Sequence, residues 1–149
     1  MHPDSFTMMR NDICVVDMDG NIETFTDEHV GVQSASWTPD GNIIYLGRPM
    51  TGVPIGTKSD LWTLDTATGA TESRMAEMVV GAGGSLSLRM PTRVMANNHL
   101  LTTNGGSHAF VRVQEGGNLN LYNVALTGVE RWEAVLGGEQ TVSLLDVDE

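Results

Sequence analysis

Serines flanked by glycines are the first residues in this chain that could do chemistry. The strings Gly83-Gly84-Ser85-Leu86-Ser87 and Gly105-Gly106-Ser107-His108-Ala109 approach the Gly-x-Ser-x-Gly pattern of a nucleophilic serine. Both lack the final glycine, whose small size lets the strained turn expose the serine. Flexible glycine loops explain both strings better than a nucleophile does. The sequence therefore predicts no catalytic residue.

Carboxylates and histidines are the next candidates, as ligands of a metal ion. The run Asp17-Met18-Asp19-Gly20-Asn21 begins like a calcium loop, but the glutamate that closes such a loop is missing. Turn preferences favour a hairpin turn here. The histidines are scattered at spacings that fit no zinc motif: His2, His29, His99 and His108. We expect no metal site.

A cofactor site is not predicted either. The glycine-rich stretch Gly81-Ala82-Gly83-Gly84 lacks the third glycine and the strand-helix context of a dinucleotide-binding loop. The sequence therefore indicates no cofactor and no cofactor-binding residue.

Composition and charge exclude several partner classes. The 149 residues carry a net charge of -11 and only eight Lys and Arg, which argues against nucleic-acid and anionic-membrane partners. No apolar run approaches the roughly 20 residues of a membrane helix, and Met1 to Arg10 lacks a secretory signal pattern. The single cysteine, Cys14, lies in an apolar run and is expected to be a small buried side chain. A soluble, cytoplasmic protein fits these features, as does an internal segment whose targeting signal lies elsewhere.

The elements that would position these residues are strands joined by tight turns. An apolar strand, an Asp- or Gly-containing turn and a return strand recur from Ile13, Leu61 and Leu121. These spacings lie near the roughly 40 to 50 residues of a four-stranded propeller blade. Between the first two copies, Trp37-Thr38-Pro39-Asp40-Gly41 predicts a further hairpin, since Pro, Asp and Gly each favour a tight turn. Because no segment shows convincing helical periodicity, the predicted fold is all-β, made of four-stranded antiparallel blades.

The repeats divide the chain, residues 1–149, into propeller units. We expect a partial blade at about 12–30, blades at about 32–75 and 85–136, and the first strand of a next blade at about 139–149. A blade cannot bury both faces alone, so neighbouring blades must stack on it.

Two features qualify this division. Ala96-Asn97-Asn98-His99 stands where a tight turn is expected, and Phe110 to Gly117 looks like an insertion. Packing between blades is a better explanation of the strand aromatics than ligand stacking, and these are Trp37, Tyr45, Trp62, Tyr122 and Trp132.

Four ordered segments carry a resemblance to a known family: Asp12–Gly20, Trp37–Tyr45, Gly56–Trp62 and Gly137–Val142. Together they resemble the propeller domain of the prolyl oligopeptidase family of serine peptidases, in particular its acylaminoacyl-peptidase-like and dipeptidyl-peptidase-like members. The resemblance implies part of a seven-bladed ring that covers an α/β-hydrolase domain. In that family the catalytic Ser, Asp and His belong to the hydrolase domain, and none of their motifs is in this chain.

The function that the resemblance implies is a non-catalytic propeller segment that gates peptide access to a separate hydrolase domain. Its partners would be that domain and peptides as transient ligands, and the chain alone would not be an enzyme. The alternative is a stand-alone propeller that serves in binding or as a scaffold. If the 149 residues were the whole protein, exposed blade faces and strand edges would lead copies to associate and close a ring.

Overall fold

The computed structural model describes residues 12–25, 30–49, 59–76, 81–82, 100–102, 105–115, 118–129 and 131–138. Every regular element in these ranges is a β-strand, and the predicted all-β class is confirmed. The strands are β1 (Ile13–Val16), β2 (Ile22–Phe25), β3 (Val30–Trp37), β4 (Ile43–Pro49), β5 (Asp60–Leu64), β6 (Thr71–Ser73), β7 (Gly81–Ala82), β8 (Leu100–Thr102), β9 (His108–Glu115), β10 (Asn118–Ala125) and β11 (Trp132–Leu136). The described residues contain no helix that is long and apolar enough to cross a membrane.

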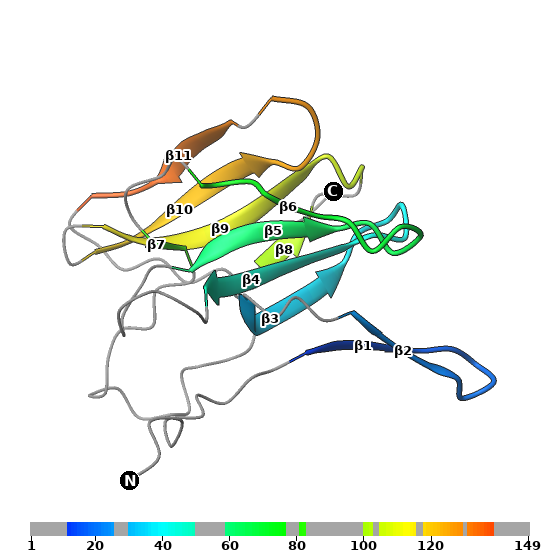
Figure 1. Cartoon of the computed structure of the whole chain (residues 1–149). Helices are drawn as coiled ribbons and strands as arrows, with labels where there is room; N and C mark the ends of the chain where they lie inside the picture. The colour runs from blue at the N-terminus through cyan, green and yellow to red at the C-terminus, as the bar shows by residue number, and fades with distance from the viewer. Residues whose placement is uncertain are drawn as a thin grey trace, which may run out of the picture.

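The strands form three antiparallel sheets that lie side by side, and the β1–β2, β3–β4, β5–β6 and β10–β11 turns lie toward one end of the stack (Figure 1). The first is the hairpin β1–β2, and the middle sheet has the order β3-β4-β5-β6. The tight turn predicted at Pro39 joins β3 to β4, and Gly41 takes the positive φ of 86° that this turn needs. The middle sheet is thus the predicted pair of hairpins.

The third sheet has the order β11-β10-β9, with β7 and β8 on the same edge of β9. Gly81 pairs with Gln114, and Leu100 pairs with Val111, so two short strands share the fourth position. The predicted insertion at Phe110 to Gly117 is wrong as far as Glu115, because β9 is the central strand of this sheet.

The turn before β9 includes Gly105, Gly106 and Ser107. It has the same position in the third sheet as the Pro39 turn has in the middle sheet. The sequence predicted this turn at residues 96–99. Those residues, and the strand expected at 139–149, lie outside the described part of the chain.

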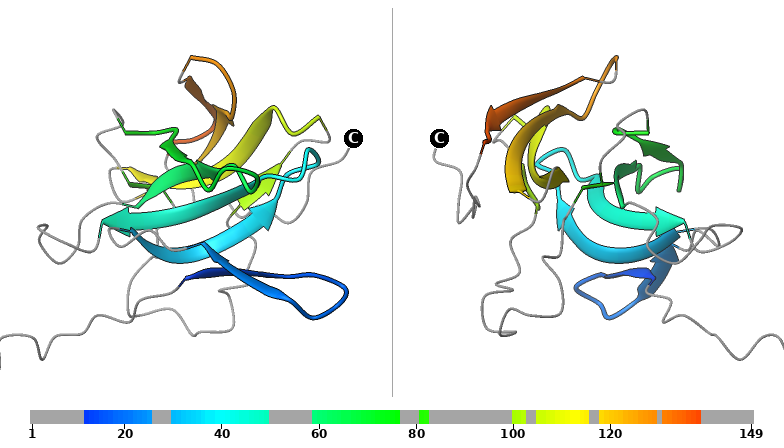
Figure 2. Two further views of the ribbon diagram at one scale, coloured as in Figure 1. Left: turned by 45° about the vertical axis from the view of Figure 1, so that its right-hand side comes forward. Right: turned by 90° about the vertical axis from the view of Figure 1, so that its left-hand side faces the viewer.

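Alternation along β4 buries the middle sheet on both faces. Ile44 and Leu46 pack with Leu61 and Met75 against the third sheet, in a cluster completed by Ala109, Val111, Val113, Val124 and Leu126. Ile43 and Tyr45 point the other way and pack with Leu64 against Ile13 of the first hairpin. Successive strand residues face opposite sides of a sheet, so one apolar run supplies two interfaces. Figure 2 shows the resulting stack of three sheets.

The sheets stack head to tail. We call the side of a sheet that meets the preceding sheet its leading face and the opposite side its trailing face. On the leading face of the middle sheet Tyr45 pairs with Trp62, and on that of the third sheet Val111 pairs with Tyr122. Corresponding positions therefore point in the same direction along the stack. Such repetition, with each unit covering the next, is the way propeller blades bury their faces.

The strand aromatics mostly pack as predicted. Tyr45 is buried and stacks on Trp62, with ring centroids 6.3 Å apart and an interplanar angle of 14°. Tyr122 and Trp132 pack against the larger apolar cluster. The prediction is wrong for Trp37, which is 54% exposed because it ends the edge strand β3 beside the exposed turn.

Cys14 is exposed, so the prediction of a buried thiol is wrong. The alternation of β1 places Ile13 and Val15 against the middle sheet and turns Cys14 to the opposite face. There its Sγ lies 3.6 Å from Oγ1 of Thr24, its partner on β2.

Candidate functional site

A hollow of about 270 Å³ lies between the turn ends of the middle and third sheets. Three carboxylates line its middle-sheet side: Asp40, Asp65 and Glu72. The opposite wall comes from turns of the third sheet and contains Gly106, Leu126 and Thr127. Because it is lined by three carboxylates, this hollow is a candidate site for a cation or a cationic ligand.

Two of these carboxylates are committed to their own turns. Asp40 accepts hydrogen bonds from the Thr38 hydroxyl and from Nδ2 of Asn42, the latter at 3.0 Å. The Thr38 bond is the main cause that lowers the pKa of Asp40 below its ordinary value. Oδ1 of Asp65 accepts from the backbone N–H groups of Ala67 and Thr68, at 2.9 and 3.0 Å. These bonds hold the turns and occupy oxygens that a cation would need.

The predicted hairpin turn at Asp17 forms in the same way. Oδ1 of Asp17 accepts from the N–H groups of Asp19 and Asn21, at 2.9 and 2.8 Å, and Oδ2 accepts from Nδ2 of Asn21 at 2.7 Å. The side-chain bond from Asn21 is the largest cause of the lowered pKa of Asp17. The described residues contain no group of three or more His, Cys, Asp or Glu placed to hold a metal ion.

The buried side chain of Arg74, just after β6, makes polar contacts between the sheets. Its side chain is fully buried, and Nε and Nη2 donate to the carbonyls of Ala125 and Gly128 at 3.2 and 3.0 Å. Nη1 lies 3.0 Å from Oε1 of Glu72. One guanidinium therefore ties the middle sheet to the β10–β11 turn. The sequence did not predict a role for Arg74. The one feature that could have pointed to it is the scarcity of cationic residues in this acidic chain.

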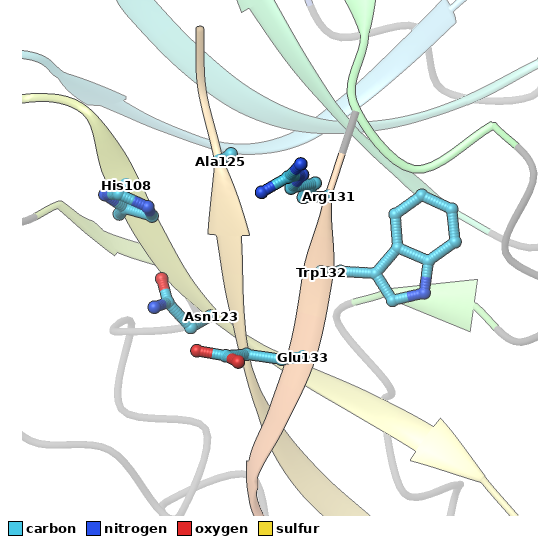
Figure 3. A pocket seen from close by; sticks show the side chains of 6 residues that line it. All are labelled: His108, Asn123, Ala125, Arg131, Trp132 and Glu133. Carbon is cyan, nitrogen blue, oxygen red and sulfur yellow. The ribbon is translucent and has the colours of Figure 1, made fainter. Parts of the chain in front are cut away.

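A second, open hollow of about 500 Å³ lies on the trailing face of the third sheet. Figure 3 shows the side chains that line it, with the Trp132 ring directed away from the others: His108, Asn123, Ala125, Arg131, Trp132 and Glu133. Oδ1 of Asn123 is buried and has no hydrogen-bond partner in the described part of the chain.

Ser107 is the one serine of the two glycine-flanked strings that the structure describes. Its Oγ lies 3.0 Å from Nδ1 of His108, the next residue. Ser107 lies in a hairpin turn between β8 and β9, whereas a nucleophile elbow joins a strand to a helix. Ser85, His2, His29 and His99 lie outside the described residues, and Gly81 and Ala82 form β7.

Comparison with known proteins bears on the fold. No family model matches the chain, and no curated protein matches it. Among solved structures the chain is similar to TolB from Acinetobacter baumannii, with a TM-score of 0.53 and 18% sequence identity. The match covers 83% of this chain and 26% of the TolB chain.

The fold is a partial β-propeller. TolB is a propeller, and at this level of identity the similarity shows the architecture alone. The chain spans about a quarter of the length of the TolB chain. The predicted propeller class is confirmed, whereas the blade number of seven stays a prediction.

Proposed function

We propose that the chain is a non-catalytic propeller segment of a prolyl-oligopeptidase-like serine peptidase and gates peptide access to a separate α/β-hydrolase domain. The observation that carries this proposal is the repeated head-to-tail junction, in which the middle sheet is buried on both faces. Stacking of this kind builds a continuous wall of sheets (Figure 1). The ordered motifs from Asp12 to Val142 connect that wall to the peptidase family by resemblance.

In this role the segment acts by steric selection. Its strands are held by two apolar clusters and by the Arg74 bonds, which favour a rigid wall over a moving lid. A ring of such blades admits short peptides and excludes folded proteins. The carboxylates of Asp17, Asp40 and Asp65 cap turns in this wall.

Two experiments test the proposal. The reading frame that contains this chain should encode, downstream, a hydrolase domain with a Gly-x-Ser-x-Gly elbow, and a frame without one would refute the peptidase assignment. The purified chain should not hydrolyse acyl-peptide or dipeptidyl chromogenic substrates. Turnover that a serine-directed inhibitor abolishes, and that is lost in Ser107→Ala, would show that the chain carries its own nucleophile.

A second candidate function is a stand-alone propeller for binding or scaffolding, which completes its ring by self-association. The exposed apolar side chains on the outer sheets favour it, since Val16 and Ile22 of the first hairpin are 61% and 68% exposed. This function predicts a reading frame without any hydrolase pattern. For both candidates we propose a cytoplasmic location, where the exposed Cys14 thiol stays reduced.

A further inference from the structure

The open hollow on the third sheet has a more enclosed counterpart on the middle sheet, the hollow of about 270 Å³. In the middle sheet Thr63, directly after Trp62, pairs with Glu72 and lines this smaller hollow. In the third sheet Asn123, directly after Tyr122, pairs with Glu133 and lines the open one. The two hollows therefore occupy the same ladder position on successive trailing faces.

The β10–β11 turn of the third sheet forms one wall of the smaller hollow. Its central apolar residue is Leu126, which is 6% exposed and lies two residues after Val124, the last residue of β10 that pairs with β11. The first hairpin carries Met18 at the corresponding place, two residues after Val16, the last residue of β1 that pairs with β2. Met18 is 102% exposed. It therefore has the position that Leu126 has in the third sheet, but no neighbouring sheet covers it.

We infer that the β1–β2 hairpin of a second copy of this chain docks on the trailing face of the third sheet, with Met18 in the hollow lined by Asn123 and Glu133. The leading face of the hairpin is free for such a contact, because Cys14, Val16, Ile22 and Thr24 are all exposed there. The receiving trailing face exposes apolar area too, since Leu136, which pairs with Leu121 on that face, is 48% exposed.

Charge supports this occupant in part. The turn that carries Met18 also carries Asp17 and Asp19, and the hollow presents the guanidinium of Arg131, which would attract them, together with the carboxylate of Glu133, which would not. An unbranched methionine fills an irregular hollow well.

The contact is heterologous, because it joins a leading face to a trailing face as both internal junctions do. Repeated contacts of this kind close a ring when the rotation at each junction permits it. The inference rests on the second candidate function. Failure of self-association would overturn it and leave the peptidase proposal to the reading-frame test.

Light scattering coupled to size exclusion tests the inference on the full chain and three matched variants. Met18→Asp blocks the leading face, Leu136→Asp blocks the trailing face, and Ala67→Asp adds the same charge on the exposed turn of the middle sheet. We expect the unaltered chain and Ala67→Asp to form one discrete multimer of the 16.0 kDa chain. Met18→Asp and Leu136→Asp should each be monomers with unchanged circular dichroism.

Mixing distinguishes this contact from any other. Met18→Asp keeps a trailing face and Leu136→Asp keeps a leading face, so an equal mixture should form a dimer and stop there. An unaltered chain that is monomeric at every concentration would overturn the inference, as would a mixture that stays monomeric. If Leu136→Asp does not fold, Arg131→Glu takes its place, because Arg131 is exposed and faces the acidic turn only in the docked state.

The Cys14 thiol gives an independent readout. Cys14 lies on the leading face of the hairpin and is exposed in the single chain. Docking would cover it, so thiol modification should be slower in the assembled chain than in monomeric Leu136→Asp, which leaves the surroundings of Cys14 unchanged. Equal rates in the two proteins would count against burial of this face.

Discussion

Replacement of Arg74 by methionine should destabilise the stack more than any other single polar change between the sheets. Methionine keeps much of the buried stem but removes the two bonds to the carbonyls of Ala125 and Gly128. A hydrogen bond to a charged group contributes roughly 1.5–3 kcal/mol, and water can reach part of the exposed turn. We therefore expect Arg74→Met to lower the free energy of unfolding by about 2–4 kcal/mol.

Two variants at the same site separate the causes. Glu72 is 70% exposed, so Glu72→Gln removes a screened ion pair and should cost no more than about 1 kcal/mol. Arg74→Lys keeps the charge but lacks the planar fork that reaches both carbonyls, and it should lie between the two.

Urea unfolding followed by circular dichroism and tryptophan fluorescence measures all three variants. The slope of free energy against urea should stay constant, so that midpoint shifts report stability. If Arg74→Met costs no more than Glu72→Gln, the bonds from Arg74 do not hold the sheets together. If Arg74→Lys is as stable as the unaltered chain, a point charge suffices and the bidentate geometry is irrelevant.

Two further predictions follow from the turns. Gly106→Ala should destabilise more than Gly128→Ala, because both have a positive φ, of 63° and 70°, but only the Cβ at position 106 would lie 3.0 Å from Cδ of Pro39. Left-handed strain alone costs roughly 1–2 kcal/mol, and equal losses in urea unfolding would contradict the close approach of Gly106 to Pro39. Hydrogen bonding lowers the pKa of Asp40 in the folded chain, so its stabilising effect is present above the unfolded pKa of about 3.9 and is lost as pH falls through the lower folded value. Asp40→Asn keeps an acceptor for Thr38 and should lose less stability than the unaltered chain between neutral pH and pH 3, whereas identical pH profiles would refute this contribution.

Local chemistry explains why much of the fold could be predicted. The turns at Asp17, Pro39 and Asp65 depend on side chains that bond the backbone of the same turn, so a few adjacent residues determine each. Alternation of apolar residues then predicts strands, and repetition predicts that the strands group into stacked units. The structure has each of these turns.

The features that could not be predicted from the sequence depend on long-range contacts. The partners of Arg74 lie more than 50 residues away, so no local pattern points to them. The exposure of Cys14 depends on which face of β1 meets another sheet. The shared edge of β7 and β8 depends on pairing with β9.

The sequence by itself determined the all-β class and, outside β7, β8 and β9, the strands and tight turns, because these depend on residues close together in the chain. The tertiary structure alone decided the direction of stacking, the buried guanidinium between the sheets and the hollow left open beside Asn123. Each of these depends on which surface covers which, and burial is a property of the packed sheets that no single strand contains.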